Sequence, residues 1–145
     1  MQTFLPYSDY FETVKCLDNK RLGKQRVEAK QILELLLDPE KESRWRNHPA
    51  VKLWDEYEFD LFDYGLVMCD EWSKRGYVDN VRSWFLQHLV LVKTKCKYMS
   101  HKQMYRRFIS NDFHASHRAA LLYKDSIHYS QFGWKETPEI KYVWS

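Results

Sequence analysis

The longest regular pattern of apolar and polar positions runs from Asp18 to Leu37. Apolar side chains recur there three or four residues apart, which predicts a helix with one face turned toward a core. Asp18 stands at its start, where a carboxylate accepts the free N–H groups of the first turn. Because a buried charge is costly without a partner, we expect Arg26 at the rim of a cleft or paired inside it. Arg26 shares the apolar face with Leu22, Ala29, Leu33 and Leu36.

A second ridge of the same predicted helix is polar. Arg21, Gln25 and Glu28 follow one another at spacings of four and three, so a cation, an amide and a carboxylate project from neighbouring turns. A rigid helix can hold such groups with the precision that a binding or catalytic site needs. Solvated helix faces with a simple salt bridge show the same spacing, so the pattern alone leaves both interpretations open.

Most of the remaining chain is also predicted to be helical. The first seven residues, MQTFLPY, are apolar and extended around Pro6, and we expect them to pack onto the fold. Ser8 or Asp9 can begin a short helix that ends at Cys16. The chain is long enough for one substantial core, so we predict a single all-α domain over residues 1–145. Further helices are predicted over 50–74, 81–92, 100–109 and 111–125, and an aromatic tail over 129–145 is expected to dock on the core.

Prolines and glycines mark boundaries and contacts in this pattern. Only four of each occur, which argues against an all-β fold with many tight turns. Pro49 suits a first helical turn, and Gly76 is expected in the left-handed conformation just past a helix end. Gly65 marks either tight packing or a break, and Gly23 permits close approach of a backbone or a ligand.

Charge is distributed unevenly, although the net charge is only +3. The window 80–111 contains no Asp or Glu and seven basic residues, whereas 55–79 carries eight acidic residues and two basic ones. Aromatic residues make up 17% of the chain, more than a core of this size needs, and several alternate with the basic positions. Such a band suits a phosphate backbone and stacked bases, although a merely soluble surface can also carry it.

The cysteines and the hydropathy pattern indicate the compartment. Cys16, Cys69 and Cys96 lie far apart without a CxxC motif, which predicts a reducing environment and no disulfide framework. No segment approaches about eighteen apolar residues, and the N-terminus lacks a signal-peptide pattern. We therefore expect a protein of the cell interior, associated with the nucleoid or, if viral, inside the host cell, without membrane contact.

Residue types alone suggest three kinds of function. A metal site can be imagined around His114 and His117 with a third histidine, His48, His88 or His128. No fixed carboxylate or cysteine partner supports that site, and no local signature supports a thiol enzyme. We expect instead that His117 and Arg118 hydrogen-bond across a cleft or hold phosphate. A nucleic-acid reader without chemistry would need only the basic band.

Six stretches carry a resemblance to a known family: MQTFLPY at 1–7, LDNKRLGKQRVEA at 17–29, WRNHP at 45–49, CDEWSKRGY at 69–77, FHASHRAALLYKD at 113–125 and YVW at 142–144. They resemble the pyrimidine-dimer DNA glycosylase family, the endonuclease V type, and are most similar to a divergent bacterial and phage branch of it. The resemblance implies a compact all-helical fold with the N-terminal segment between helices. It also implies duplex DNA that is bound across a basic face and kinked, with one nucleotide flipped out.

The resemblance further implies an α-amine nucleophile that attacks the sugar C1′ and forms a Schiff base. An α-amine has an unperturbed pKa of about 7.7–8.0, so a good part of it is neutral at physiological pH. The family also needs a glutamate on the first long helix and arginines that bind phosphate. By position, Arg26 matches one such arginine, and Arg21 or Lys24 can serve near the other. The glutamate position is expected at Gly23, with Glu28 as the nearest downstream carboxylate, which either faces the same cleft or is a structural partner of Arg26.

A bulky Gln2 should block removal of the initiator methionine, so the terminal amine belongs to Met1. We predict a base-excision enzyme that cleaves the N-glycosidic bond of a damaged or modified pyrimidine, with or without strand scission at the abasic site. The alternative is a non-catalytic DNA-binding module for such a base. No metal, organic cofactor or protein partner is expected. The expected catalytic residues are Met1 and Glu28, and the expected contacts to double-stranded DNA are Arg21, Lys24, Gln25, Arg26, Asn47, His48, His117, Arg118, Lys93, Lys95 and Lys97.

Overall fold

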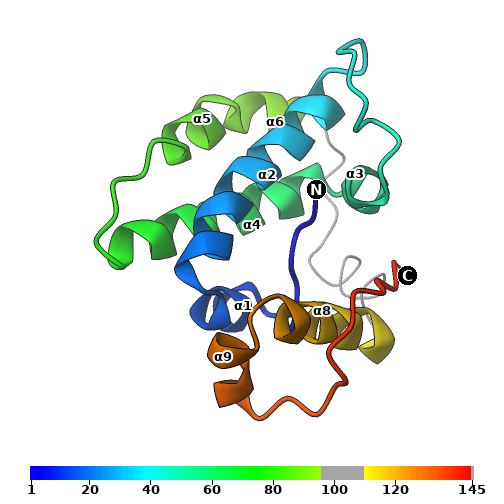
Figure 1. Cartoon of the computed structure of the whole chain (residues 1–145). Helices are drawn as coiled ribbons and strands as arrows, with labels where there is room; N and C mark the ends of the chain where they lie inside the picture. Colours follow the sequence, from blue (N-terminus) through cyan, green and yellow to red (C-terminus); the bar gives the residue numbers. More distant parts are fainter. Residues whose placement is uncertain (96–109, 145) are drawn as a thin grey trace.

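Two long helices, α2 (Asn19–Leu37) and α4 (Glu58–Lys74), pack against each other at the centre of the molecule (Figure 1). This computed structural model describes residues 1–95 and 110–144. Within those ranges the regular structure is helical and no strand occurs, so the predicted all-α fold is confirmed. No helix there is long and apolar enough to cross a bilayer. The shorter elements are α1 (Tyr10–Cys16), α3 (Pro49–Trp54), α5 (Arg82–Gln87), α6 (Leu89–Lys95), α8 (Asn111–Lys124), α9 (Ser126–Tyr129) and the 3-10 turn η1 (Ser130–Phe132).

Two glycines allow close packing around the central pair. A Cβ added at Gly65 of α4 would come within 2.3 Å of the Phe85 ring of α5. A Cβ added at Gly23 of α2 would lie 2.9 Å from the Trp72 ring of α4. Gly65 therefore marks tight packing, because α4 continues through it without interruption.

Two of the predicted helices are each divided in two. The segment 50–74 is interrupted between α3 and α4, where Glu56 adopts a left-handed conformation with φ of 71°. The segment 81–92 is interrupted at His88, which separates α5 from α6. The apolar spacing continues across both interruptions because both halves bury their apolar residues in the same core. The predicted helix over 100–109 lies outside the described residues.

The helix ends follow the expected chemistry. Asp9 caps α1 by accepting from the N–H groups of Phe11 and Glu12, and Asp18 caps α2 through Arg21 N–H at 3.4 Å. Gly76 has φ of 94° just past α4, as expected for a left-handed residue at a helix end. Helix α8 begins at Asn111, as predicted, and ends one residue before the expected end at 125.

The N-terminal segment 1–7 runs as an extended chain between the central helices and α8 (Figure 1). Residues 2–6 are buried, and their backbone groups bond to side chains of several elements because an extended chain has no internal partners. Phe4 N–H donates to Gln25 Oε1 at 2.8 Å, and Tyr64 Oη donates to Phe4 O at 2.8 Å. The expectation that this segment packs onto the fold is confirmed.

The aromatic C-terminal tail docks on the same body. Trp134 stacks on Tyr129 with ring centroids 5.6 Å apart, and its indole N–H donates to Tyr7 Oη at 2.7 Å. Farther on, the chain runs beside α8 (Figure 1), and Val143 N–H donates to Ser116 Oγ at 3.0 Å. The docking predicted for this tail is therefore confirmed.

Candidate functional site

Glu28 meets the N-terminal segment on the polar ridge of α2. Gln2 N–H donates to Glu28 Oε2 at 3.0 Å, and Gln25 Nε2 donates to the same oxygen at 3.3 Å. Lys24 Nζ lies 3.7 Å from Glu28 Oε1. Glu28 is only 7% exposed, so these donors compensate for the removal of its carboxylate from water. The carboxylate is thereby held at the backbone N–H of the residue that follows Met1, whose α-amine is the chain terminus.

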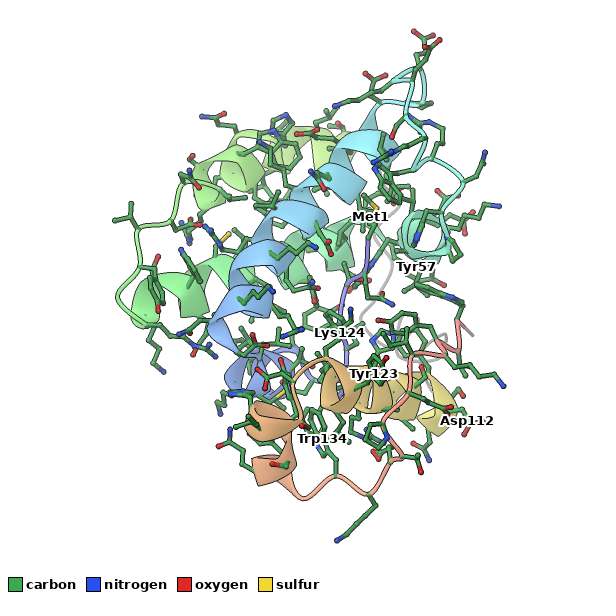
Figure 2. All side chains as sticks on the ribbon, viewed as in Figure 1. Met1, Tyr57, Asp112, Tyr123, Lys124 and Trp134 are labelled. Carbon is green, nitrogen blue, oxygen red and sulfur yellow. The ribbon has the colours of Figure 1, made fainter. Side chains whose placement is uncertain are left out.

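A pocket of about 430 Å³ opens beside this carboxylate. Figure 2 shows Met1 at the start of the extended N-terminal segment and Lys124 at the C-terminal end of α8, which lies toward α2. Among the described lining residues, Glu28 is the one acid, whereas four side chains are cationic, which favours an anionic ligand at the mouth. The lining consists of Met1, Gln2, Phe4, Lys20, Arg21, Lys24, Gln25, Glu28, His48, Lys124, Ile140 and Tyr142.

His48 brings a second titratable group to the pocket. Its Nδ1 accepts from Ala50 N–H at 3.0 Å, which caps α3 and leaves the proton of the neutral ring on Nε2. Burial and repulsion from the α-amine lower the pKa of His48, and the Glu28 carboxylate only partly opposes them. His48 is therefore neutral at physiological pH, and its electrostatic coupling to the amine and to Glu28 places all three groups in one environment.

Tyr142 contributes the phenol of the C-terminal tail. Burial raises the pKa of Tyr142, the neighbouring Gln2 amide lowers it, the charge of Glu28 raises it and the charge of Arg21 lowers it. The net direction is upward, so the phenol is neutral at physiological pH. Tyr142 lines the pocket together with Met1 and Glu28.

Arg21 is held at the pocket by an ion pair on its own helix. Its guanidinium Nη1 lies 3.2 Å from Asp18 Oδ2, and Asp18 also accepts from the Tyr129 hydroxyl. Burial acts to raise the pKa of Asp18, but the bond from Tyr129 and the charge of Arg21 outweigh it and the net shift is downward. Asp18 therefore remains ionised and fixes the guanidinium.

Arg26 lies outside this pocket. Its guanidinium pairs with Asp79 and lies 4.5 Å from the centroid of the Trp72 ring. Of the two expectations for Arg26, the paired and buried one is confirmed. The expected contact of Arg26 with phosphate is not supported by this geometry, because the guanidinium is already paired with the carboxylate of Asp79.

His117 and Arg118 anchor the N-terminal segment. Leu5 N–H donates to His117 Nδ1 at 2.8 Å, and Arg118 Nη1 donates to Pro6 O at 2.7 Å while its Nε pairs with Glu136. His117 is completely buried, and burial, with a smaller contribution from His114, lowers its pKa to about 3. Both residues therefore hydrogen-bond to the N-terminal segment, and the fully buried neutral ring of His117 does not face phosphate.

Gly23, where the resemblance places the family's glutamate, has no carboxylate and does not line the pocket. Gly23 lies against Trp72, whereas Glu28 faces the N-terminal segment and the pocket. Glu28 is also not a partner of Arg26, which is paired with Asp79. Five positions of α2 correspond to about 1.4 turns, so Gly23 and Glu28 project in different directions, and the packed structure identifies the face that meets the pocket.

The remaining predicted contacts are dispersed. Asn47 is exposed next to the pocket residue His48 but does not line the pocket, and Lys93 is exposed on α6. Lys97 and the side chain of Lys95 lie outside the described residues. The expected contact of these four residues with DNA therefore stays a prediction.

The alternative chemistries find little support in the described part of the chain. No group of three or more His, Cys, Asp or Glu side chains there is placed to hold a metal ion. Cys16 and Cys69 are free and buried, and burial raises the pKa of each thiol to about 12. Such thiols remain protonated and are poor nucleophiles at neutral pH.

Several pocket residues were missed by the sequence analysis. Lys20 precedes Lys24 by four residues, so the ridge spacing that identified Lys24 also pointed to it. Lys124 and Tyr142 lie in stretches that resemble the family, but no local spacing links them to α2. They reach the pocket only because α8 and the tail pack against the N-terminal segment.

The family model for pyrimidine dimer DNA glycosylase matches residues 1–84. The chain therefore belongs to the pyrimidine dimer DNA glycosylase family. The matched region contains Met1, Glu28, Arg21 and His48, whereas the pocket residues from α8 and the tail lie beyond it. No curated protein and no solved structure matches the chain.

Proposed function

We propose that this protein excises a damaged or modified pyrimidine from double-stranded DNA, with the α-amine of Met1 as the nucleophile. One observation carries the proposal: the buried Glu28 carboxylate accepts from Gln2 N–H at 3.0 Å, one residue from that amine, inside a cationic pocket. Family membership supports DNA as the substrate and glycosylase chemistry as the reaction class.

In the proposed reaction the neutral amine attacks C1′ of the target nucleotide. The N-glycosidic bond breaks and its electron pair leaves with the base, while the nitrogen gives up a proton to Glu28. The product is an amine adduct that can open to a Schiff base, after which strand scission at the abasic site can follow. The chain's own amine and carboxylate suffice for these steps, so the proposal requires no metal or cofactor.

The cations at the pocket suit the phosphates that flank an extruded nucleotide. Lys20, Lys24 and Lys124 are exposed at its mouth, and Arg21 is held there by Asp18. We further propose that Lys93 and its basic neighbours extend the contact with DNA. We also propose that the whole chain acts as one domain and that the protein works in the cell interior at the nucleoid. DNA affinity should fall steeply between about 50 and 200 mM salt.

Borohydride trapping tests the proposal directly. Purified protein is incubated with a duplex that carries a single abasic site, and borohydride reduces any Schiff base to a stable adduct. We expect a covalent adduct that disappears when the N-terminus is acetylated, and peptide mass spectrometry should place the attached sugar on Met1. A DNA complex without any adduct would instead favour the non-catalytic module that recognises a damaged base.

A further inference from the structure

The C-terminal segment forms part of the pocket although it lies outside the residues matched by the family model. Glu139 N–H donates to Ala119 O at 3.3 Å, and Val143 N–H donates to Ser116 Oγ at 3.0 Å. These two bonds fasten the segment along α8 (Figure 1) and bring Ile140 and Tyr142 to the pocket wall. The wall is therefore built by a segment far from α2 in the sequence.

The ring of Tyr142 is held by aromatic neighbours. Its centroid lies 5.6 Å from that of His117, 6.4 Å from Phe4 and 5.7 Å from Trp144. The contacts with His117 and Trp144 are edge-on or tilted, which aromatic pairs favour. A phenylalanine would make the same contacts, so docking of the tail accounts for the ring but not for the hydroxyl.

The hydroxyl of Tyr142 has a hydrogen to donate. Its pKa responds to the amide of Gln2, the residue whose N–H binds Glu28, and to the charges of Glu28 and Arg21, and Tyr142 lines the pocket with all three residues. Within the described residues, no protein acceptor receives a bond from this hydroxyl. A phenol that remains protonated and has no acceptor within the protein can direct its O–H toward a ligand in the pocket.

We propose that Tyr142 is a further catalytic residue, whose hydroxyl donates to the ring oxygen O4′ of the sugar attacked by the amine. This inference rests on the proposed function. It assigns to the tail the opening of the sugar ring, the step that follows attachment of the amine at C1′. A hydrogen-bond donor aimed at an oxygen that gains negative charge lowers the barrier most when it is fixed in advance.

The proposed step balances in atoms and charge. The C1′–O4′ bond of the amine adduct breaks and its electron pair goes to O4′, while the nitrogen lone pair forms the C1′=N bond. O4′ takes the proton of Tyr142, and the phenol recovers a proton from water in the open pocket. The product is the protonated Schiff base and a free sugar hydroxyl, and no oxidant or reductant is needed.

The test uses the full-length protein and a duplex with one abasic site, so it does not depend on the identity of the target base. Single-turnover adduct formation in borohydride is compared for wild type, Tyr142→Phe and Tyr123→Phe. Tyr123 is a matched control because it is exposed on α8 and does not line the pocket (Figure 2). We expect Tyr142→Phe to slow adduct formation on the order of 100-fold and Tyr123→Phe to leave it unchanged.

Two further measurements separate catalysis from docking. The affinity for a duplex with a tetrahydrofuran abasic analogue, which lacks the C1′ hydroxyl and forms no Schiff base, should be the same for wild type and Tyr142→Phe. The thermal unfolding midpoint should also be retained, because the ring contacts remain. Parallel losses of analogue affinity and thermal stability would reduce Tyr142 to a docking residue and overturn the inference.

The outcomes also distinguish this inference from the proposed function. A wild-type adduct formed at the same rate by Tyr142→Phe would overturn the role of Tyr142 and leave the amine mechanism standing. The absence of any wild-type adduct would overturn the amine mechanism and, with it, the assignment of Tyr142. A selective loss of rate in Tyr142→Phe would support both.

Discussion

Glu28→Gln separates the charge of this carboxylate from its shape. In the wild type, Glu28 Oε2 accepts from Gln2 N–H at 3.0 Å and from Gln25 Nε2 at 3.3 Å. The substitution keeps an oxygen that can accept both hydrogen bonds. It removes the negative charge near the α-amine and the pairing with Lys24 at 3.7 Å. The fold is therefore retained while proton transfer to residue 28 is lost.

Glu28→Gln should have a small effect on the free energy of unfolding and a large effect on the reaction rate. Lys24 is mostly exposed, so its ion pair contributes little, whereas weakening charge-assisted bonds to a neutral acceptor costs about 1 kcal/mol in the free energy of unfolding. For a chain of this size, that corresponds to a fall of about 2–4 °C in the unfolding midpoint. Loss of a general acid or base typically costs about 10²–10⁴ in rate. Catalysis should therefore fall far more than stability.

The assay measures the single-turnover rate of adduct formation on abasic-site DNA, with the unfolding midpoint measured by circular dichroism. Glu34→Gln is the matched control, because Glu34 lies on the same helix but pairs at the surface with Lys30 and Lys41. We expect it to react like wild type. A Glu28→Gln protein that also reacts at the wild-type rate would refute the reasoning and remove Glu28 from the mechanism.

Three further predictions concern the scaffold of the site. Gly65→Ala should lower the free energy of unfolding by about 1–3 kcal/mol in chemical denaturation, because its Cβ would meet the Phe85 ring at 2.3 Å; an unchanged midpoint would contradict the packing. Asp79→Asn should cost about 3–5 kcal/mol, since it leaves the buried Arg26 cation unpaired, and a cost below about 1 kcal/mol would argue against that pair. The pKa of His117 is about 3 in the folded state, below its ordinary value, so the unfolded state binds a proton at a higher pH than the folded state does. The free energy of unfolding should therefore fall as the pH drops from about 6.5 toward 3. His117→Gln should flatten this dependence, which chemical denaturation at several pH values measures.

Much of the candidate site can be predicted from local spacing. Arg21, Gln25 and Glu28 fall on one ridge by helix geometry alone, and all three line the pocket. The same reasoning cannot decide whether a ridge faces solvent or a site. Local spacing therefore left the salt-bridge interpretation open, and it did not decide whether Glu28 faces the cleft or pairs with Arg26.

The roles of the other predicted residues required long-range contacts. Arg26 is paired with Asp79, a residue 53 positions away, and His117 binds the backbone of Leu5, 112 positions away. Local sequence patterns do not show which residues so far apart in the chain come into contact. A basic residue in the sequence therefore suggested phosphate where the fold provides a buried internal partner.

The sequence by itself determined the all-α class, the cap of α2 and the polar ridge of α2, because these depend on interactions within a few residues. It also determined family membership through its first 84 residues. Only the tertiary structure decided that Gln2 N–H meets Glu28, 26 residues away, and that the tail brings Tyr142 to the same pocket. The physical reason is that an extended N-terminal chain must find partners for its buried backbone groups, and those partners come from helices distant in sequence.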